Sequence, residues 1–167
     1  MTRTVLIGLG SNRGDRKTNL QRALLEIESR RLGRVKAKSS LWRTEPIGMA
    51  GAEDFLNAAA LLETELSAEE LLQGLLAIEE KLGRVRGPGS GPKPRTLDLD
   101  ILFFGSERFG RPGLQIPHPR VQERRFALAP LAEIAPDFFH PLLRKTLSAL
   151  LSEVTDRSRV ERLEESW

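Results

Sequence analysis

Apolar and polar residues follow regular spacings in the first part of the chain. Residues 4–10 are β-branched, apolar and closed by glycine, which predicts a first strand. Over residues 17–31, the apolar side chains from Leu20 to Ile27 recur on one helical face, and Gly33 is placed to end that helix. The pattern therefore predicts a strand followed by a helix.

Two further strands and a second helix come next. Residues 35–43 alternate and residues 55–64 are apolar and β-prone, so both are predicted strands, joined by a loop that is rich in proline and glycine. Ser67 and Glu70 form an S-x-x-E capping box ahead of a leucine-rich helical pattern, with Gly83 at its end. This pattern predicts a capped amphipathic helix.

The last predicted strand completes a known element order. Residues 84–94 carry several glycines and prolines and are expected to form a loop, whereas residues 97–104 alternate as a strand. The order β-α-β-β-α-β predicts an α+β fold, a ferredoxin-like antiparallel sheet with two helices on one face. Beyond this unit, helices are predicted near 126–134 and 147–154. The charged tail at 155–167 is expected to be a solvated helix without a catalytic role.

The length and composition fit one domain over residues 1–167, because this length is sufficient to bury a core. No apolar run approaches the roughly 18 residues of a membrane span. The N-terminal stretch lacks a cleavage pattern, so a signal peptide is not expected. We expect a cytoplasmic location. The absence of cysteine excludes disulfides, thiolate catalysis and cysteine-ligated zinc.

The net charge is only +3, yet arginine outnumbers lysine. A guanidinium group matches two phosphate oxygens at once, so this bias favours phosphate ligands. A surface that has drifted toward arginine explains most of these residues equally well. Composition alone leaves both interpretations open.

Two carboxylates carry the candidate chemistry. Asp98 and Asp100 are two apart on a predicted strand, so they share a face about 6.5 Å apart. Their repulsion must be relieved by arginine or by a hard divalent cation such as Mg²⁺. For an isolated D-x-D, a surface pair neutralised by Arg84, Arg86 or Arg95 is the better explanation, but here these arginines flank a glycine-rich loop that could fold over a phosphate chain.

The residues around this pair resemble those of 6-hydroxymethyl-7,8-dihydropterin pyrophosphokinases. The string P-R-T-L-D-L-D-I at 94–101 carries most of the resemblance, with G-R-V-R at 83–86 and I-P-H at 116–118. It extends over residues 4 to 140, roughly, through G-S-N at 10–12, R-T at 43–44, F-L-N at 55–57 and R-R-F at 124–126.

The resemblance implies a step of folate biosynthesis in which a pterin hydroxymethyl oxygen attacks the β-phosphorus of ATP and AMP leaves. It implies two Mg²⁺ ions held by Asp98 and Asp100, with Arg84 and Arg95 as catalytic arginines. The implied partners are ATP and the hydroxymethyl dihydropterin, with no nucleic acid or membrane, and a monomer is expected. The positions that match the ATP site are Glu79, Arg84, Arg86, Arg95, Ile101, His118 and Arg124.

The resemblance also implies a pterin site. Phe55 and Phe126 match the two aromatic residues that sandwich the ring, and Asn57 matches the amide that recognises its hydrogen-bonding edge. Thr44, Glu45 and Ile47 match positions that contribute mainly backbone contacts. The loop at 87–94 lacks the tryptophan that some relatives carry, and Pro119 replaces an aromatic residue seen beside the histidine in others.

Two other functions are compatible with the predicted fold. A ferredoxin-like domain can bind RNA, but tyrosine is absent, aromatic residues make up 5% of the chain, and the Asp98–Asp100 pair would repel phosphate without a metal ion. A non-catalytic ligand-sensing domain is a third possibility that turnover would exclude. No G-x-x-x-x-G-K-[ST] string is present, which excludes a P-loop kinase. Residues 84–94 are a hypothetical lid.

Overall fold

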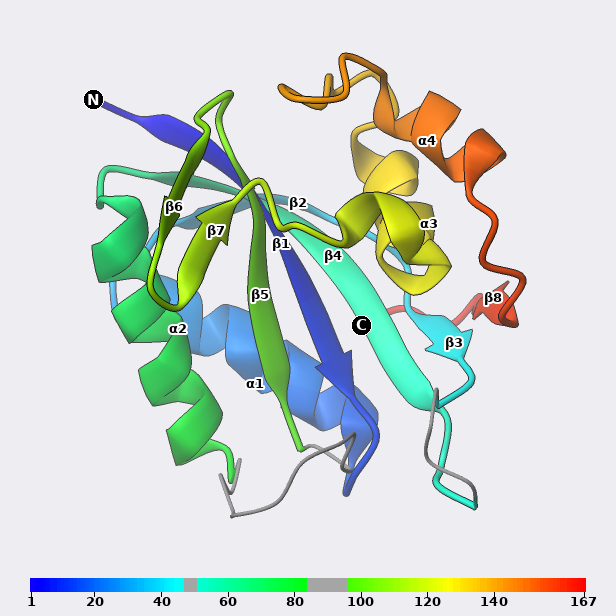
Figure 1. Ribbon diagram of the computed structural model, residues 1–167. Coiled ribbons are helices and arrows are strands. Elements are labelled where there is room, and N and C mark those ends of the chain that lie inside the picture. Colours follow the sequence, from blue (N-terminus) through cyan, green and yellow to red (C-terminus); the bar gives the residue numbers. More distant parts are fainter. Residues whose placement is uncertain (47–50, 84–95) are drawn as a thin grey trace.

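The computed structural model describes residues 1–46, 51–83 and 96–167. Within these residues the chain has a mixed α+β fold around an antiparallel sheet (Figure 1). The sheet order is β5-β1-β4-β3-β8, and β2 also pairs with β4. Its strands are β1 (Arg3–Ser11), β2 (Arg34–Lys38), β3 (Trp42–Thr44), β4 (Phe55–Thr64), β5 (Asp98–Phe104) and β8 (Val160–Arg162).

Helices cover both faces of the sheet (Figure 1). Val5 and Ile7 pack with α1 and α2, whereas Leu6 and Ala59 pack with α3 and α4, because successive residues of a strand point to opposite faces. The remaining elements are α1 (Arg16–Ser29), α2 (Ala68–Lys81), β6 (Phe109–Arg111), β7 (Leu114–Ile116), η1 (Val121–Glu123), α3 (Arg125–Ile134) and α4 (Leu147–Glu153).

Local sequence signals set several element ends. Ser67 Oγ accepts the Glu70 backbone N–H at 3.1 Å and Glu70 accepts the Ser67 N–H at 3.0 Å, which confirms the predicted capping box. The predicted stop of the first helix is wrong, because α1 ends at Ser29 and Arg31 already has φ 58°. Gly33 serves close packing instead, since a Cβ there would lie 3.0 Å from the Glu63 carbonyl.

The predicted second strand is interrupted. Residues 39–41 separate β2 from β3, so the strand expected at 35–43 is two short strands. The carboxylate of Glu133, on α3, accepts from the Ser40 N–H at 3.0 Å and from the Trp42 indole N–H at 2.9 Å. A helix distant in sequence therefore satisfies backbone and side-chain donors at the break.

The C-terminal tail differs from its prediction as a solvated helix. Residues 160–162 form β8, which pairs antiparallel with β3. Beyond β8, the Leu163 N–H donates to the Leu41 carbonyl at 2.8 Å and the Trp167 indole N–H donates to the Ser39 carbonyl at 2.8 Å. Pairing with a distant strand thus overrides the local charge pattern, which alone is compatible with a helix.

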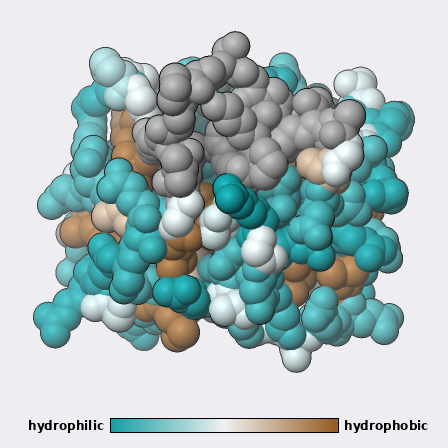
Figure 2. Space-filling view, turned by 90° about the horizontal axis from the view of Figure 1, so that it is seen from below, coloured by the Kyte–Doolittle hydropathy of each residue, from teal (hydrophilic) through white to brown (hydrophobic). Residues whose placement is uncertain are grey.

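On the face that Figure 2 shows, the coloured surface is mainly hydrophilic, and apolar residues form only scattered areas. Among the described residues, no helix combines the length and the apolar character that crossing a membrane requires.

Candidate active site

The floor of the candidate site is the α3 face of three neighbouring strands. Strand register places Gly10 of β1 between Asp98 of β5 and Asn57 of β4. Two residues along the strands, Gly8 is opposite Asp100. Adjacent strands lie about 4.8 Å apart, so Asp98 and Asn57 are separated by about 10 Å across a glycine that projects no side chain.

A pocket of about 480 Å³ opens above this floor, within the usual size range of small-molecule sites. Its walls come from β3 and the residue after it, the start of β4, the segment from His118 to α3, and the C-terminal segment. The lining residues are Gly8, Leu9, Gly10, Thr44, Glu45, Phe55, Asn57, Ala58, Asp98, Asp100, Leu102, His118, Arg120, Val121, Glu123, Arg124, Phe126, Ala127 and Asp156.

The two predicted metal ligands share the pocket. Asp98 and Asp100 are half-buried, while Leu99 and Ile101 between and beside them are buried in the core, as the strand alternation predicts. Two carboxylates are hard oxygen donors, and Mg²⁺ commonly binds one or two of them together with substrate phosphates. Two carboxylates on one strand face therefore fit a cation whose remaining ligands come from phosphate. The described residues contain no cluster of three or more acidic, histidine or cysteine side chains that could hold a metal ion.

Asn57 is held in a defined orientation. It is 9% exposed, and its Nδ2 donates to Thr44 Oγ1 at 2.7 Å. A Cβ at Gly10 would lie 2.6 Å from Asn57 Oδ1, so the glycine leaves the space that this amide occupies. The side chain of Thr44 therefore orients Asn57, a role that the sequence did not indicate.

Both predicted aromatic residues line the same pocket. Phe55 begins β4 and Phe126 lies in the first turn of α3. The Arg124 guanidinium lies 5.7 Å from the centre of the Phe126 ring. Burial and the nearby Arg120 lower the pKa of Arg124, while the carboxylates of Asp100 and Asp98 raise it, so this cation and the acidic pair share one electrostatic environment.

His118 lies at the boundary with a second, adjoining pocket of about 370 Å³, which Ile101 also lines. Its Nδ1 accepts the Arg120 backbone N–H at 3.2 Å, so the neutral ring carries its proton on Nε2. Burial lowers the pKa of His118, with a contribution from Arg124 and against the effect of Asp98. A neutral imidazole in this state can donate a hydrogen bond from Nε2–H to a phosphate oxygen.

Glu79 lies outside both pockets' linings. It is 1% exposed on α2, and its carboxylate accepts the Leu99 N–H at 2.7 Å. Leu99 lies between Asp98 and Asp100 in the chain, so Glu79 binds the backbone of β5 between the two aspartates. This contact supports the strand that carries the aspartates, whereas the resemblance implies that Glu79 contacts ATP.

Four of the expected site residues, Arg84, Arg86, Arg95 and Ile47, lie outside the described residues, as does the hypothetical lid at 84–94. The described residues bring together the predicted metal, pterin and remaining phosphate positions, apart from Glu79. Ile101 reaches the site through the second pocket alone.

Sequence reasoning missed several lining residues. Gly8 and Gly10, spaced by two on a strand, could have been identified as positions where a ligand approaches the backbone. No sequence pattern indicated Asp156, because its role depends on contacts that form only in the folded chain. Burial raises the pKa of Asp156, but hydrogen bonds from the Ser158 and Arg125 backbone outweigh it and leave the pKa below its usual value.

Comparison with known proteins agrees with this geometry. The family model described as 7,8-dihydro-6-hydroxymethylpterin-pyrophosphokinase matches residues 6–136. A 2-amino-4-hydroxy-6-hydroxymethyldihydropteridine pyrophosphokinase of Synechocystis sp. is 44% identical over 149 residues, 89% of this chain and 75% of the relative. One of the same name from Methylorubrum extorquens is 42% identical over 164 residues, 98% of this chain and all of the relative (100%).

One solved structure with the same fold belongs to a longer protein. A Plasmodium falciparum HPPK-DHPS structure with pteroate matches with a TM-score of 0.72 at 16% identity, covering 92% of this chain. This chain spans 42% of that longer protein. The comparisons support the enzyme interpretation over an RNA-binding or ligand-sensing domain, and the chain belongs to the 7,8-dihydro-6-hydroxymethylpterin-pyrophosphokinase family.

Proposed function

We propose that this chain transfers diphosphate from ATP to 6-hydroxymethyl-7,8-dihydropterin and releases AMP, as a step of folate biosynthesis. The hydroxymethyl oxygen forms a bond to the β-phosphorus, and the bond from that phosphorus to the α,β-bridging oxygen breaks. The electron pair leaves with AMP, and the hydroxyl proton passes to water. The observation that carries the proposal is the row Asp98–Gly10–Asn57, found in a member of this family.

The acidic end of that row is the proposed phosphate end. Asp98 and Asp100 would hold two Mg²⁺ ions, which when bound supply positive charge to the phosphate oxygens. Arg124 lies close enough to this pair for their charges to interact, and it provides a fixed cation for the polyphosphate. His118 lies between the two pockets and can donate Nε2–H to a phosphate oxygen.

The other end of the row suits the pterin. Asn57, oriented by Thr44, presents an amide to the polar edge of the heterocycle, and Phe55 and Phe126 offer aromatic surface for its faces. The separation of about 10 Å between Asp98 and Asn57 leaves room for a bicyclic ring whose hydroxymethyl group points to the acidic end. The second pocket, with Ile101, suits the nucleoside of ATP.

Further assignments follow from the family pattern. Arg84 and Arg95 would stabilise charge on the transferred group, Arg86 and Glu79 would support ATP binding, and Glu45 and Ile47 would contact the pterin. The strand order, with β2 and β3 as one broken strand, supports a ferredoxin-like topology with added C-terminal elements. We expect one catalytic domain over residues 1–167, acting as a cytoplasmic monomer on small-molecule substrates.

A product assay tests the proposal. The chain is incubated with ATP, Mg²⁺ and 6-hydroxymethyl-7,8-dihydropterin, and nucleotides are separated chromatographically. AMP should appear in equal amount to a diphosphorylated pterin, and omission of either the pterin or Mg²⁺ should abolish it. Formation of ADP, or no pterin-dependent consumption of ATP, would contradict the proposal.

A further inference from the structure

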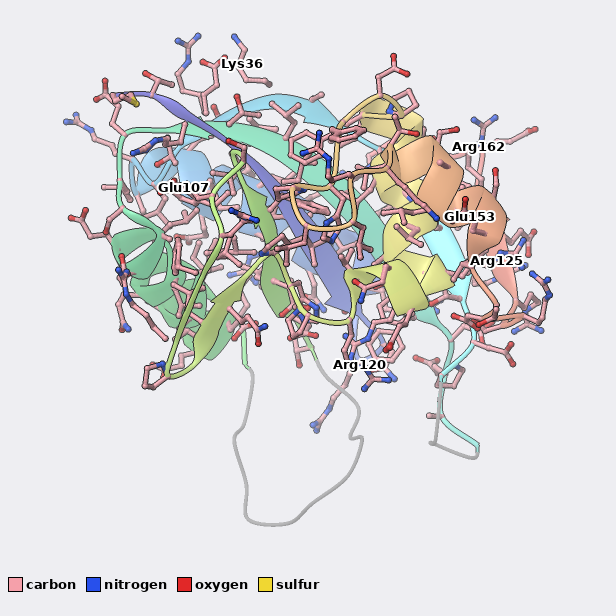
Figure 3. All side chains as sticks on the ribbon, turned by 45° about the horizontal axis from the view of Figure 1, so that its top comes forward. Lys36, Glu107, Arg120, Arg125, Glu153 and Arg162 are labelled. Atoms are coloured by element: carbon pink, nitrogen blue, oxygen red, sulfur yellow. The ribbon has the colours of Figure 1, made fainter. Side chains whose placement is uncertain are left out.

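Residues 156–159 connect two walls of the pocket that are far apart in the sequence. One wall is the start of α3, and the other is the connection from β3 to β4. In Figure 1, α3 lies near the edge of the sheet that β3 and β8 form, and Figure 3 shows the labelled Arg125 in that region. The match to the family model ends at residue 136, so this segment lies beyond the residues that the model matches.

The contact with the first wall is made by Asp156. Helix α3 receives no side-chain cap from Arg124, the residue that precedes it. Instead, Asp156 Oδ2 accepts the Arg125 N–H at 3.0 Å, and a carboxylate at this position also complements the helix dipole. The Arg125 side chain donates in return to the Ser158 carbonyl at 3.2 Å. The next residue of the helix is Phe126, so this cap fixes the turn that carries a pocket-lining ring.

The carboxylate of Asp156 is itself held in place. Its Oδ1 accepts the Ser158 N–H at 2.8 Å, so each oxygen receives a backbone donor. An amide in place of the carboxylate would set an N–H group against one of these N–H donors. Asp156 is therefore matched to its position by charge as well as by shape.

The contact with the second wall is made by Arg159. Its backbone N–H donates to Glu45 Oε1 at 2.6 Å, and the Glu45 N–H donates to the Arg159 carbonyl at 3.3 Å. Its guanidinium donates to Asp54 Oδ2 at 2.8 Å. Glu45 follows Thr44, and Asp54 precedes Phe55, so one arginine binds both ends of the connection between two pocket-lining residues.

We propose that residues 156–159 form a clasp that holds the two walls at the spacing a flat heterocycle requires, with Asp156 as a positioning residue for Phe126. The inference rests on the proposed function, because it takes the pterin as the ligand of these walls. The clasp acts on pterin affinity. Among the described residues, the hydrogen bonds of the Asp156 carboxylate go to Arg125 and Ser158 and not to the acidic end of the pocket, where Asp98 and Asp100 project from β5.

Ligand affinity in the full chain tests the clasp. Asp156→Asn is compared with the matched control Glu165→Gln, which neutralises an exposed carboxylate of the tail beyond β8 that pairs with Lys17 at 3.4 Å. Dissociation constants are measured for 6-hydroxymethylpterin and for α,β-methylene-ATP with Mg²⁺, at a temperature where unfolding curves show each variant fully folded. Asp156→Asn should weaken pterin binding roughly tenfold, the order expected for loss of a charged cap, and change nucleotide binding less than threefold.

Glu165→Gln should leave both affinities unchanged. Unaltered pterin affinity in Asp156→Asn, or equal losses of affinity for pterin and nucleotide, would overturn the clasp.

If Asp156→Asn does not fold, Arg159→Ala tests the clasp in its place. The Arg159 side chain is 59% exposed and the backbone bonds to Glu45 survive the substitution, so this variant is expected to fold. It should weaken pterin binding about threefold, as expected for an exposed ion pair, and no change would overturn the clasp. Failure of the unaltered chain to bind pterin would instead contradict the proposed function.

Discussion

The two faces of the sheet use the same strands for different purposes. On the face toward α1 and α2, Val5, Ile7 and Leu9 are almost completely buried. On the other face, the alternate residues of β1 are Leu6 under α3 and α4, then Gly8 and Gly10 beneath the pocket. One face is therefore core from Val5 to Leu9, while the other changes from core to site half-way along the strand.

Alternate residues of the same strand therefore serve different purposes, because those on one face contribute to stability and those on the other face form the site. Substitutions on the α1 and α2 face should reduce the free energy of unfolding and leave the activity of folded molecules intact. Substitutions at the glycine and aspartate positions should do the reverse, because these side chains are half-buried or absent and contribute little to the core. The following predictions test that separation.

The largest effect is expected at the aspartates. Asp98→Asn and Asp100→Asn should each reduce turnover about a thousandfold, the scale on which preorganised charge acts in catalysis, with little change in melting temperature. Steady-state AMP formation and thermal unfolding measure the two quantities. Asp137→Asn, an exposed carboxylate away from the pocket, is the matched control and should retain full activity. Near-normal turnover in either site variant would break the assignment.

The opposite face provides the counterpart. Ile7 is fully buried, so Ile7→Ala should lower the free energy of unfolding by about 2–5 kcal/mol through lost burial and a residual cavity. Chemical denaturation measures that loss. At low temperature, the turnover of folded protein should remain within about twofold. A large loss of turnover in fully folded Ile7→Ala would show that the two faces are not independent.

A smaller effect is expected at the glycine floor. Gly10→Ala would place a Cβ 2.6 Å from Asn57 Oδ1, so the amide must move and its 2.7 Å bond to Thr44 must lengthen. Loss of such an oriented hydrogen bond should raise the pterin dissociation constant by roughly tenfold. Gly110→Ala, where nothing lies within 4 Å, is the control. Titration of both variants with 6-hydroxymethylpterin measures the difference, and equal affinities would remove Asn57 from the proposed pterin site.

The smallest effect concerns pH. His140 is 3% exposed, its Nδ1 accepts the Leu142 and Leu143 N–H groups at 3.1 Å, and burial lowers its pKa below the ordinary 6.5. The unfolded chain therefore binds the proton more readily, so this contribution to stability is present above about pH 6.5 and is lost as the pH falls through the folded-state pKa. The loss should be about 1 kcal/mol, the scale of one hydrogen bond.

Denaturation at pH 7.5 and pH 5.0 measures that loss. In His140→Asn the difference between the two pH values should shrink, while a difference equal to that of the unaltered chain would exclude His140 as its source. Because His140 packs edge-on against Phe103, on the α3 side of the core, this variant also tests whether that layer contributes to stability without altering turnover.

The sequence predicted the elements that local signals specify. The Ser67–Glu70 box and the alternation from Asp98 to Ile101 depend on neighbours in the chain, and both are confirmed. The split between β2 and β3 depends on Glu133, and β8 depends on pairing with β3. Neither contact can be inferred from local periodicity, so the prediction of one continuous strand and a terminal helix was wrong in both places.

The candidate site divides in the same way. The aspartates were identified from their spacing on a predicted strand together with a resemblance to a family, and the aromatic residues through that resemblance alone. The described members of this set line two adjoining pockets, apart from Glu79, which contacts β5. Asp156 and the orienting bond from Asn57 to Thr44 were missed, because each is a side-chain contact that only the folded register creates. The catalytic arginines at 84 and 95 remain predictions from the family pattern.

The most direct test of the account is a crystal structure with Mg²⁺, α,β-methylene-ATP and 6-hydroxymethylpterin. We expect metal ions about 2.0–2.1 Å from carboxylate oxygens of Asp98 and Asp100, with the pterin beside Asn57 and its hydroxymethyl group toward the metal ions. Metal ions bound elsewhere, or a pterin outside the pocket above Gly10, would contradict the central claim that this face of the sheet is the catalytic site.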